Sequence, residues 1–172
     1  MTRCIAKPSM FILARACAWV AATALTGCMS YAPYRVTPGQ DAAEVQAAMG
    51  APTGRYRLDG GGERLEYARG PEGSHTYMVD LDAQGRVLGW QQVLTEANFL
   101  AIVPGQTRDE VLQQLGRPGQ VRAIARQGIE LWTWRYESLT CTLFVVSMEP
   151  AGRVREASHA PDPRCDDPRR DD

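Results

Sequence analysis

The chain has 172 residues, which suffices for one ordinary domain or two very small ones. Hydrophobic residues make up 44% of the chain and charged residues 23%, values that are typical of a protein with a folded core. The net charge is −1, so the chain lacks the excess of basic residues that nucleic-acid binding needs for contact with phosphates.

The first 27 residues are predicted to be a signal peptide. Basic residues end at Arg15, and an uncharged stretch follows over residues 16–27. As a helix this stretch would cover about 18 Å, well short of the roughly 30 Å hydrocarbon core, so it is too short to span a membrane. Leu25-Thr26-Gly27-Cys28 then resembles the lipobox of bacterial lipoproteins, in which the cysteine becomes the new N-terminus. The alternative is an ordinary signal peptide followed by an incidental cysteine.

The lipobox resemblance implies that Cys28 is the lipid attachment site. Acyl chains such as palmitate would hold it in the membrane, each buried methylene contributing about 0.8 kcal/mol. Met29 stands where, in many bacteria, an aspartate retains a lipoprotein in the inner membrane. We therefore expect the protein at the periplasmic face of the outer membrane.

An internal repeat follows a short tether over residues 28–35. Pro38-Gly39-Gln40 recurs as Pro104-Gly105-Gln106, at an offset of 66. The segments 78–87 and 145–154 both end in Gly-Arg-Val, at an offset of 67. A drift of one residue across a loop is typical of a duplication. The sequence therefore predicts a first unit at 36–93, a second unit at 94–158, and a Pro-, Asp- and Arg-rich tail at 159–172.

Each unit is predicted to open with a capped helix. Asp41-x-x-Glu44 and Thr107-x-x-Glu110 both fit the capping box, in which two side chains bond the free amides of the first turn. Gly50 and Gly116 stand where a left-handed residue ends a helix, each with a proline two residues further on. A further short helix capped by Thr95 is expected before the second unit's main helix.

Strands are predicted after each of the two main helices. Alternating patterns and turn residues place them at 64–68, 76–81 and 86–93 in the first unit, and at 120–125, 129–136 and 139–148 in the second. The predicted fold class is therefore α+β. Each unit would pack one or two short helices on a three- to four-stranded antiparallel meander.

These residues together resemble the SmpA/OmlA (BamE-like) outer-membrane lipoproteins. The resemblance rests on residues 102–111, on Leu115-Gly116-Arg117-Pro118 and on the aromatic strand around Trp132-x-Trp134-x-Tyr136. It implies an ααβββ fold and an accessory role beside the machinery that assembles outer-membrane β-barrels. Gln40 and Gln106 depart from the family, which usually has methionine after the glycine. Tandem copies of this shape also resemble the β-lactamase inhibitory protein superfamily.

No constellation of residues for catalysis, a cofactor or a metal is evident in the sequence. The dipeptide Ser74-His75 lacks the Gly-x-Ser-x-Gly context of a nucleophile elbow. Asp80 and Asp82 share one face of a strand, where a divalent ion is conceivable, but solvated acids are the favoured interpretation. We therefore expect a protein that is not an enzyme.

Two cysteines remain as thiols once Cys28 is acylated and the signal peptide removed. In an oxidising compartment, Cys141 and Cys165 are candidates for a disulfide. It would close a loop of about 24 residues and contribute roughly 3 kcal/mol. The alternative is a buried Cys141 and a loose Cys165 in the tail.

Three aromatic residues, Trp132, Trp134 and Tyr136, share one face of a predicted strand. They could form a partner-binding platform, or they could form the core contact between sheet and helices, which is the favoured interpretation. The functional hypothesis is a small protein-binding lipoprotein that supports outer-membrane protein assembly or envelope integrity, with membrane lipid and an envelope protein as partners. The alternative hypothesis is an inhibitor-like module that binds a periplasmic enzyme.

Overall fold

The computed structural model describes residues 32–70 and 73–166, and they form an α+β structure with two four-stranded antiparallel sheets. The first sheet has the order β1-β2-β3-β4 and the second β5-β6-β7-β8, so both are meanders. The strands of the first sheet are β1 (Gly54–Arg57), β2 (Glu63–Arg69), β3 (His75–Leu81) and β4 (Val87–Gln92). Those of the second are β5 (Gln120–Ile124), β6 (Ile129–Arg135), β7 (Thr142–Met148) and β8 (Val154–Pro161).

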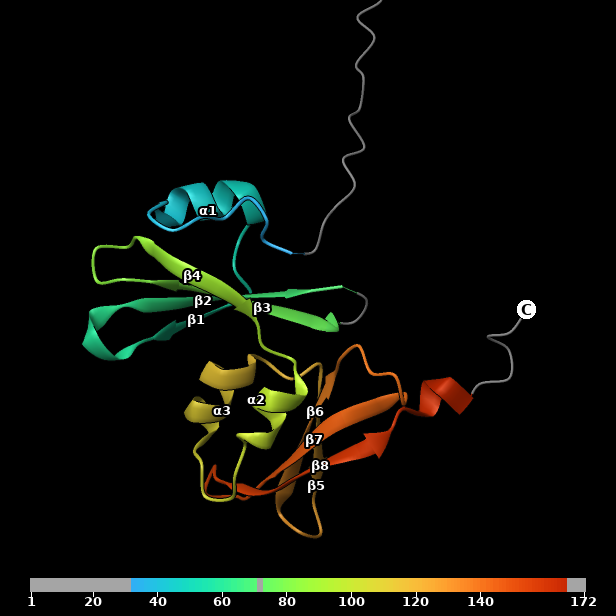
Figure 1. Ribbon diagram of the computed structural model, residues 1–172. Helices are drawn as coiled ribbons and strands as arrows, with labels where there is room; N and C mark the ends of the chain where they lie inside the picture. The colour runs from blue at the N-terminus through green and yellow to red at the C-terminus, as the bar shows by residue number, and fades with distance from the viewer. Residues whose placement is uncertain (1–31, 71–72, 167–172) are drawn as a thin grey trace, which may run out of the picture.

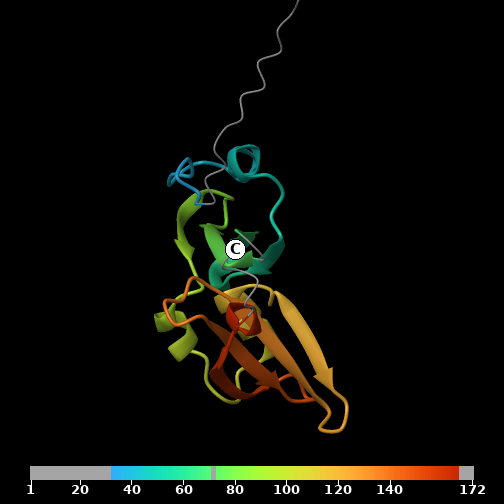
Figure 2. The same cartoon turned by 90° about the vertical axis from the view of Figure 1, so that its right-hand side faces the viewer.

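The helices lie in two layers that alternate with the sheets (Figure 1). Helix α1 (Ala42–Met49) covers one face of the first sheet, and α2 (Glu96–Leu100) and α3 (Arg108–Leu115) lie between the two sheets. The view turned by 90° shows the same succession from α1 down to the second sheet (Figure 2). Short 3-10 turns, η1 (Asp59–Gly61) and η3 (Pro163–Asp166), complete the described elements.

Both main helices begin as the sequence predicted. In α1 and in α3 the N-cap side chain accepts the amide of the glutamate three residues on, and that glutamate accepts the amide of the cap. The short helix α2 is capped by Thr95, whose hydroxyl accepts the Asn98 amide at 3.4 Å. In all three helices, local side-chain bonds satisfy amides that have no partner within the helix.

The ends of α1 and α3 differ in one respect from the prediction. Gly50 and Gly116 have the expected positive φ, 80° and 76°, but their ψ values are −168° and −172°. This is not the left-handed helical region but an extended region with positive φ that is essentially confined to glycine. The chain therefore leaves each helix in an extended direction. Glycine is needed more strictly than predicted, because other residues enter the left-handed helical region more readily than this one.

Two strands were missed by the sequence analysis, and both are edge strands. β1 has four residues, and β8 has a single fully buried side chain, Val154. The predicted tail boundary at residue 159 was therefore too early, because β8 continues to Pro161 and η3 follows it. The strand expected from residue 139 begins only at Thr142, and Leu139 is fully exposed.

Two apolar clusters hold the layers together. The first joins α1 to the first sheet, with Val45 of the helix against side chains such as Leu65 and Val79. The second joins α2 and α3 to the second sheet, and it also contains Met78 of β3. Because successive strand residues point to opposite faces, Val79 faces α1 while Met78 faces the second cluster. The first sheet is therefore covered on both faces.

The motifs that repeat in sequence contact each other in the same way in both halves. The Gln40 side-chain oxygen accepts the Thr37 amide at 2.8 Å, and that of Gln106 accepts the Val103 amide at 2.9 Å. The arginine of each Gly-Arg-Val donates to the glycine carbonyl of the matching Pro-Gly-Gln, Arg86 to Gly39 and Arg153 to Gly105. A register shift falls between β3 residues 80 and 81 and again between β7 residues 147 and 148.

Candidate functional site

The predicted lipid attachment site, Cys28, and the lipobox before it lie outside the described residues. The first described residues, 32–35, lead directly to Val36, which is buried under α1 in the first cluster. Within residues 32–70 and 73–166, no helix is both long enough and apolar enough to cross a membrane.

Two of the three predicted platform residues, Trp132 and Trp134 of β6, belong to the core. Trp132 and Trp134 are 4% and 1% exposed, and they pack among Phe144, Val146 and the helices. The indole of Trp134 donates to the Gly116 carbonyl at the end of α3, 3.2 Å away. The alternative of an exposed binding platform is therefore wrong for these two residues, because α2 and α3 cover this face.

Tyr136 lies at the border of the same cluster. Its ring meets that of Phe99 edge to face, with centroids 4.7 Å apart, and its hydroxyl donates to Glu96 at 2.7 Å. The residue is half-buried, and its polar end reaches the surface beside α2. Tyr136 thus links β6 to α2 and does not stand out from the sheet as a platform.

The structure brings Cys141 and Cys165 together as a disulfide. Their Cα atoms are 6.4 Å apart, within the range that disulfides span. The bond ties η3 to the residue that precedes β7. Next to it, the Asp162 amide donates to the Cys141 carbonyl at 2.9 Å. The part of the tail that the structure describes is therefore held against the second sheet at two points.

An ion pair that the sequence analysis missed strengthens this attachment. The Arg135 guanidinium on β6 donates to the Asp162 carboxylate at 2.8 Å. Hydrogen bonding from Arg135 lowers the pKa of Asp162 to about 2, and the nearby Arg164 backbone amide acts in the same direction. The two residues are 27 positions apart, and no local pattern in the sequence connects them.

A buried carboxylate lies where α3 meets the first sheet. Glu66 of β2 is 0% exposed and accepts three kinds of donor: the Thr53 hydroxyl at 2.9 Å, the Arg117 amide at 3.2 Å, and the Tyr56 hydroxyl. Burial and the hydrogen bond to Glu66 raise the pKa of Tyr56. We call Glu66, Thr53, Tyr56 and Arg117 the Glu66 cluster; it connects the two halves of the chain through hydrogen bonds.

A second contact between the halves lies beside the Glu66 cluster. Arg64 makes a two-pronged ion pair with Asp80, at 2.6 and 2.7 Å, and also donates to the Gln113 carbonyl of α3 at 2.8 Å. Asp80 is therefore paired with a cation and is not the solvated acid that the sequence predicted. Asp82 accepts two amides of the β3–β4 turn. Among the described residues there is no group of acids, histidines and cysteines that could hold a metal ion.

His75 has a serine and a glutamate as neighbours. Its Nδ1 lies 3.2 Å from the Ser74 hydroxyl, and its Nε2 lies 3.3 Å from Glu137. In a catalytic triad the acid is buried so that it fixes the imidazole, whereas the Glu137 side chain is 78% exposed. This arrangement gives no ground for assigning a nucleophile.

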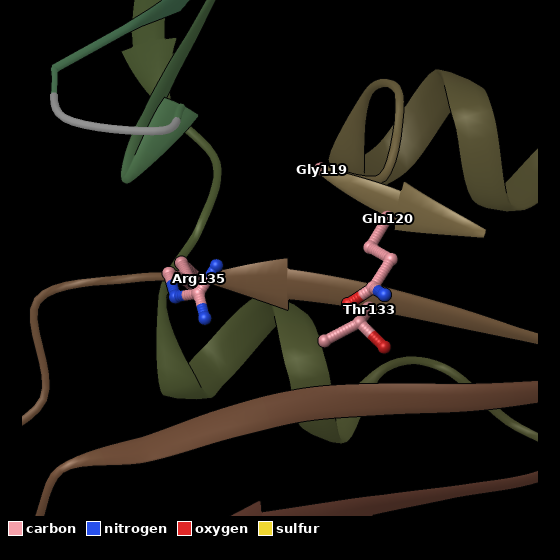
Figure 3. Close-up of a pocket in the computed structure, with 4 residues that line it drawn as sticks. All are labelled: Gly119, Gln120, Thr133 and Arg135. Carbon is pink, nitrogen blue, oxygen red and sulfur yellow. The ribbon is translucent and has the colours of Figure 1, made fainter. Parts of the chain in front are cut away.

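A shallow pocket of about 350 Å³ lies on the second sheet, lined by Gly119, Gln120, Thr133 and Arg135 (Figure 3). Thr133 and Arg135 alternate with the two buried tryptophans along β6, so they point away from α2 and α3. We call this side, with Leu131, Thr133 and Val145 on it, the outer face of the second sheet. Among the residues that the structure describes, this is the one sheet face that no α-helix covers.

No known protein family and no curated protein matches this sequence. Among solved structures, the chain is similar to an extracellular protein containing a SCP domain from Bacillus anthracis, at 9% identity and a TM-score of 0.28. The similarity covers 72% of this chain and 44% of that protein, so the chain spans less than half of its length. A TM-score this low supports no conclusion about fold or function.

Proposed function

We propose that this protein is a bacterial lipoprotein held at the periplasmic face of the outer membrane by acyl groups on Cys28. The observation that carries the proposal is the sequence Leu25-Thr26-Gly27-Cys28 after an uncharged stretch of signal-peptide length. Seven residues separate Cys28 from Val36, so an extended tether reaches at most about 25 Å. The folded part would therefore work close to the membrane.

The anchor is tested by replacing the cysteine. In membrane and soluble fractions of the bacterium, the wild-type chain is expected in the membrane fraction. Cys28→Ala is expected to leave residues 1–27 attached or to release the chain into the soluble fraction. Cys165→Ser serves as the matched control because it also removes a cysteine but leaves the anchor intact. Equal fractionation of wild type and Cys28→Ala, with residues 1–27 removed from both chains, would contradict the proposal.

The fold proposal is that the two halves are tandem BamE-like units. It is supported by the two capping boxes, by the two glycines with the same unusual conformation, and by the paired contacts of Pro-Gly-Gln with Gly-Arg-Val. The four-stranded meander after each main helix agrees with it. The glutamine that replaces the family's usual methionine closes the same turn in both units, which gives that departure a structural role.

The functional proposal is that the protein is a binding module that supports outer-membrane protein assembly or envelope integrity. It rests on the family resemblance together with the proposed anchor. Deletion of the gene is expected to lower porin levels in the outer membrane and to raise sensitivity to detergent. The wild-type gene should restore both, and Cys28→Ala should not. Unchanged porin levels and unchanged detergent sensitivity in the deletion strain would contradict this role.

A lipoprotein that binds a periplasmic enzyme as an inhibitor remains the second hypothesis, because paired units of this shape occur in such inhibitors. Crosslinking in cells followed by affinity capture separates the two. Recovery of a barrel-assembly component supports the first hypothesis. Recovery of a hydrolase whose activity falls when the purified protein is added supports the second.

A further inference from the structure

An exposed aromatic side chain lies close in the sequence to the proposed lipid anchor. Tyr34 is 74% exposed, more than any other aromatic residue that the structure describes. It is the sixth residue after Cys28, so even a fully extended chain would place it at most about 22 Å from that cysteine. If Cys28 carries acyl groups, as proposed above, Tyr34 is therefore always within reach of the lipid surface.

Tyr34 is the outermost member of a row of three aromatic rings. Its ring meets that of Trp90 on β4 edge to face, with centroids 6.2 Å apart, and Trp90 meets Tyr77 of β3 in the same way at 5.9 Å. Tyr77 is buried, Trp90 is half-buried and Tyr34 is exposed. The row therefore leads from the core of the first sheet to the surface, and the exposed ring is held against the folded part of the chain.

The indole N–H of Trp90 differs from those of the two core tryptophans. Trp132 donates to the Glu130 carboxylate, and Trp134 donates to the Gly116 carbonyl. Within residues 32–70 and 73–166, the indole N–H of Trp90 has no acceptor, and it is not enclosed in the core. Tryptophan and tyrosine are enriched at membrane–water interfaces, where the apolar ring meets lipid and the polar group still finds a partner. Trp90 and Tyr34 have the chemistry of such a pair.

The side chains around the two rings carry little charge. Ala32, Met49 and Trp90 are half-buried and pack against the first apolar cluster. The last turn of α1, which ends at Met49, contains no charged residue. The Met49 carbonyl accepts from Arg69, a cation that the phosphates of lipid headgroups tolerate. We call Ala32, Tyr34, Met49 and Trp90 the tether surface; it can approach lipid without burying an unpaired acid.

We infer that the tether surface lies on the membrane, with Tyr34 and Trp90 in the headgroup layer. The inference rests on the proposed acylation of Cys28, which makes the bilayer the partner nearest to this surface. Residues 32–36, in blue, enter the fold beside α1, the layer furthest from the second sheet (Figure 1). With the α1 side against the lipid, the second sheet points away from the membrane. The anchor then orients the protein, and the second half is turned toward partners in the periplasm.

Tryptophan fluorescence in vesicles tests this placement with the acylated protein. Protein purified from membranes is reconstituted into phosphatidylcholine vesicles with or without bromine atoms on the acyl chains close to the headgroups, which quench nearby tryptophans. Trp132 and Trp134 are 4% and 1% exposed, so the difference between wild type and Trp90→Phe reports on Trp90 alone. The matched control adds Gln127→Trp to Trp90→Phe. Gln127 is exposed in the turn between β5 and β6, at the end of the molecule opposite α1 (Figures 1 and 2).

The inference predicts that brominated lipid lowers the wild-type emission by up to roughly one third, since Trp90 is one of three tryptophans after residue 27. Trp90→Phe should lose this quenching, and the added Gln127→Trp should not restore it. Tyr34→Asp, at an exposed position, should keep its fold and its vesicle binding but show weaker quenching of Trp90. Quenching as strong as in wild type would overturn the placement of Tyr34.

Flotation of the same vesicles separates this inference from the proposed anchor. If the protein floats with the vesicles but Trp90 is not quenched, the inference is overturned and the anchor stands. Equal quenching of Trp90 and of Gln127→Trp would also overturn the inference, because the molecule would then have no fixed orientation. A protein that does not float with the vesicles would contradict the anchor and the inference together.

Discussion

Gly116→Ala tests the contact between the two halves at its tightest point. A β-carbon there would lie 2.9 Å from Cγ2 of Thr76, 3.0 Å from Cδ of Glu66 and 3.2 Å from Cε of Met78. Real contacts of this kind are rarely so short, so these three side chains would have to shift, at a cost of about 1–3 kcal/mol. The conformation with positive φ and extended ψ costs alanine about 1–3 kcal/mol more. We therefore expect Gly116→Ala to lower the free energy of unfolding by about 2–6 kcal/mol in total.

Gly50→Ala is the matched control for this substitution. It has the same backbone conformation but open space around the new methyl group, so only the conformational part of the cost should appear, about 1–3 kcal/mol. Both variants are measured by urea unfolding, with tryptophan fluorescence and circular dichroism recorded together to check for a single transition. The difference between them isolates the packing of α3 against the first sheet. Equal losses in the two variants would refute the tight contact at Gly116.

Three further substitutions test the attachment of the tail to the second sheet and the hydrogen bonds between the two halves of the chain. Cys165→Ser, which removes the bond to Cys141, should lower the free energy of unfolding by about 3 kcal/mol, and thiol titration of unreduced wild type should find neither cysteine free. Because Arg135 lowers the pKa of Asp162 from 3.8 to about 2, the folded state gains stability above about pH 4 that is lost as the pH falls toward 2. Asp162→Asn should remove that part of the acid dependence, and an unchanged pH profile of unfolding would contradict the ion pair. Glu66→Ala should destabilise by about 1–3 kcal/mol for each donor left without an acceptor, and Glu66→Gln by less because its amide oxygen still accepts; equal losses on urea unfolding would contradict the buried hydrogen bonds.

The features that local rules decide could be predicted from the sequence. A capping box needs only two residues three positions apart, and both boxes formed as predicted, at Asp41 and Thr107. Most of the strands were predicted from alternating residue patterns, as in β6, and from the turn residues between them. The pairing of Cys141 with Cys165 followed from counting thiols, and the structure agrees with it.

The features that depend on distant parts of the chain could not be predicted. Glu66 lies between the apolar residues Leu65 and Tyr67, a pattern that predicts a solvent-exposed side chain. It is buried because the end of α3, which is distant in the sequence, packs against this face of the first sheet. Strand β8 has few buried side chains, since it is an edge strand whose stability comes from backbone pairing with β7. Arg135 and Asp162 carry no local signal of their ion pair. The sequence of the second sheet does not show which of its faces the helices cover, because α2 and α3 are separate segments of the chain.

The central claim, that this is an acylated envelope lipoprotein, is tested most directly by the mass of the intact protein extracted from membranes in detergent. The account predicts a chain that begins at Cys28, with the added mass of acyl groups on that residue and the loss of residues 1–27. Fragmentation should place the added mass on Cys28 and leave Cys141 and Cys165 without it. A chain that retains the first 27 residues, begins at another position, or carries no acyl group on Cys28 would contradict the account.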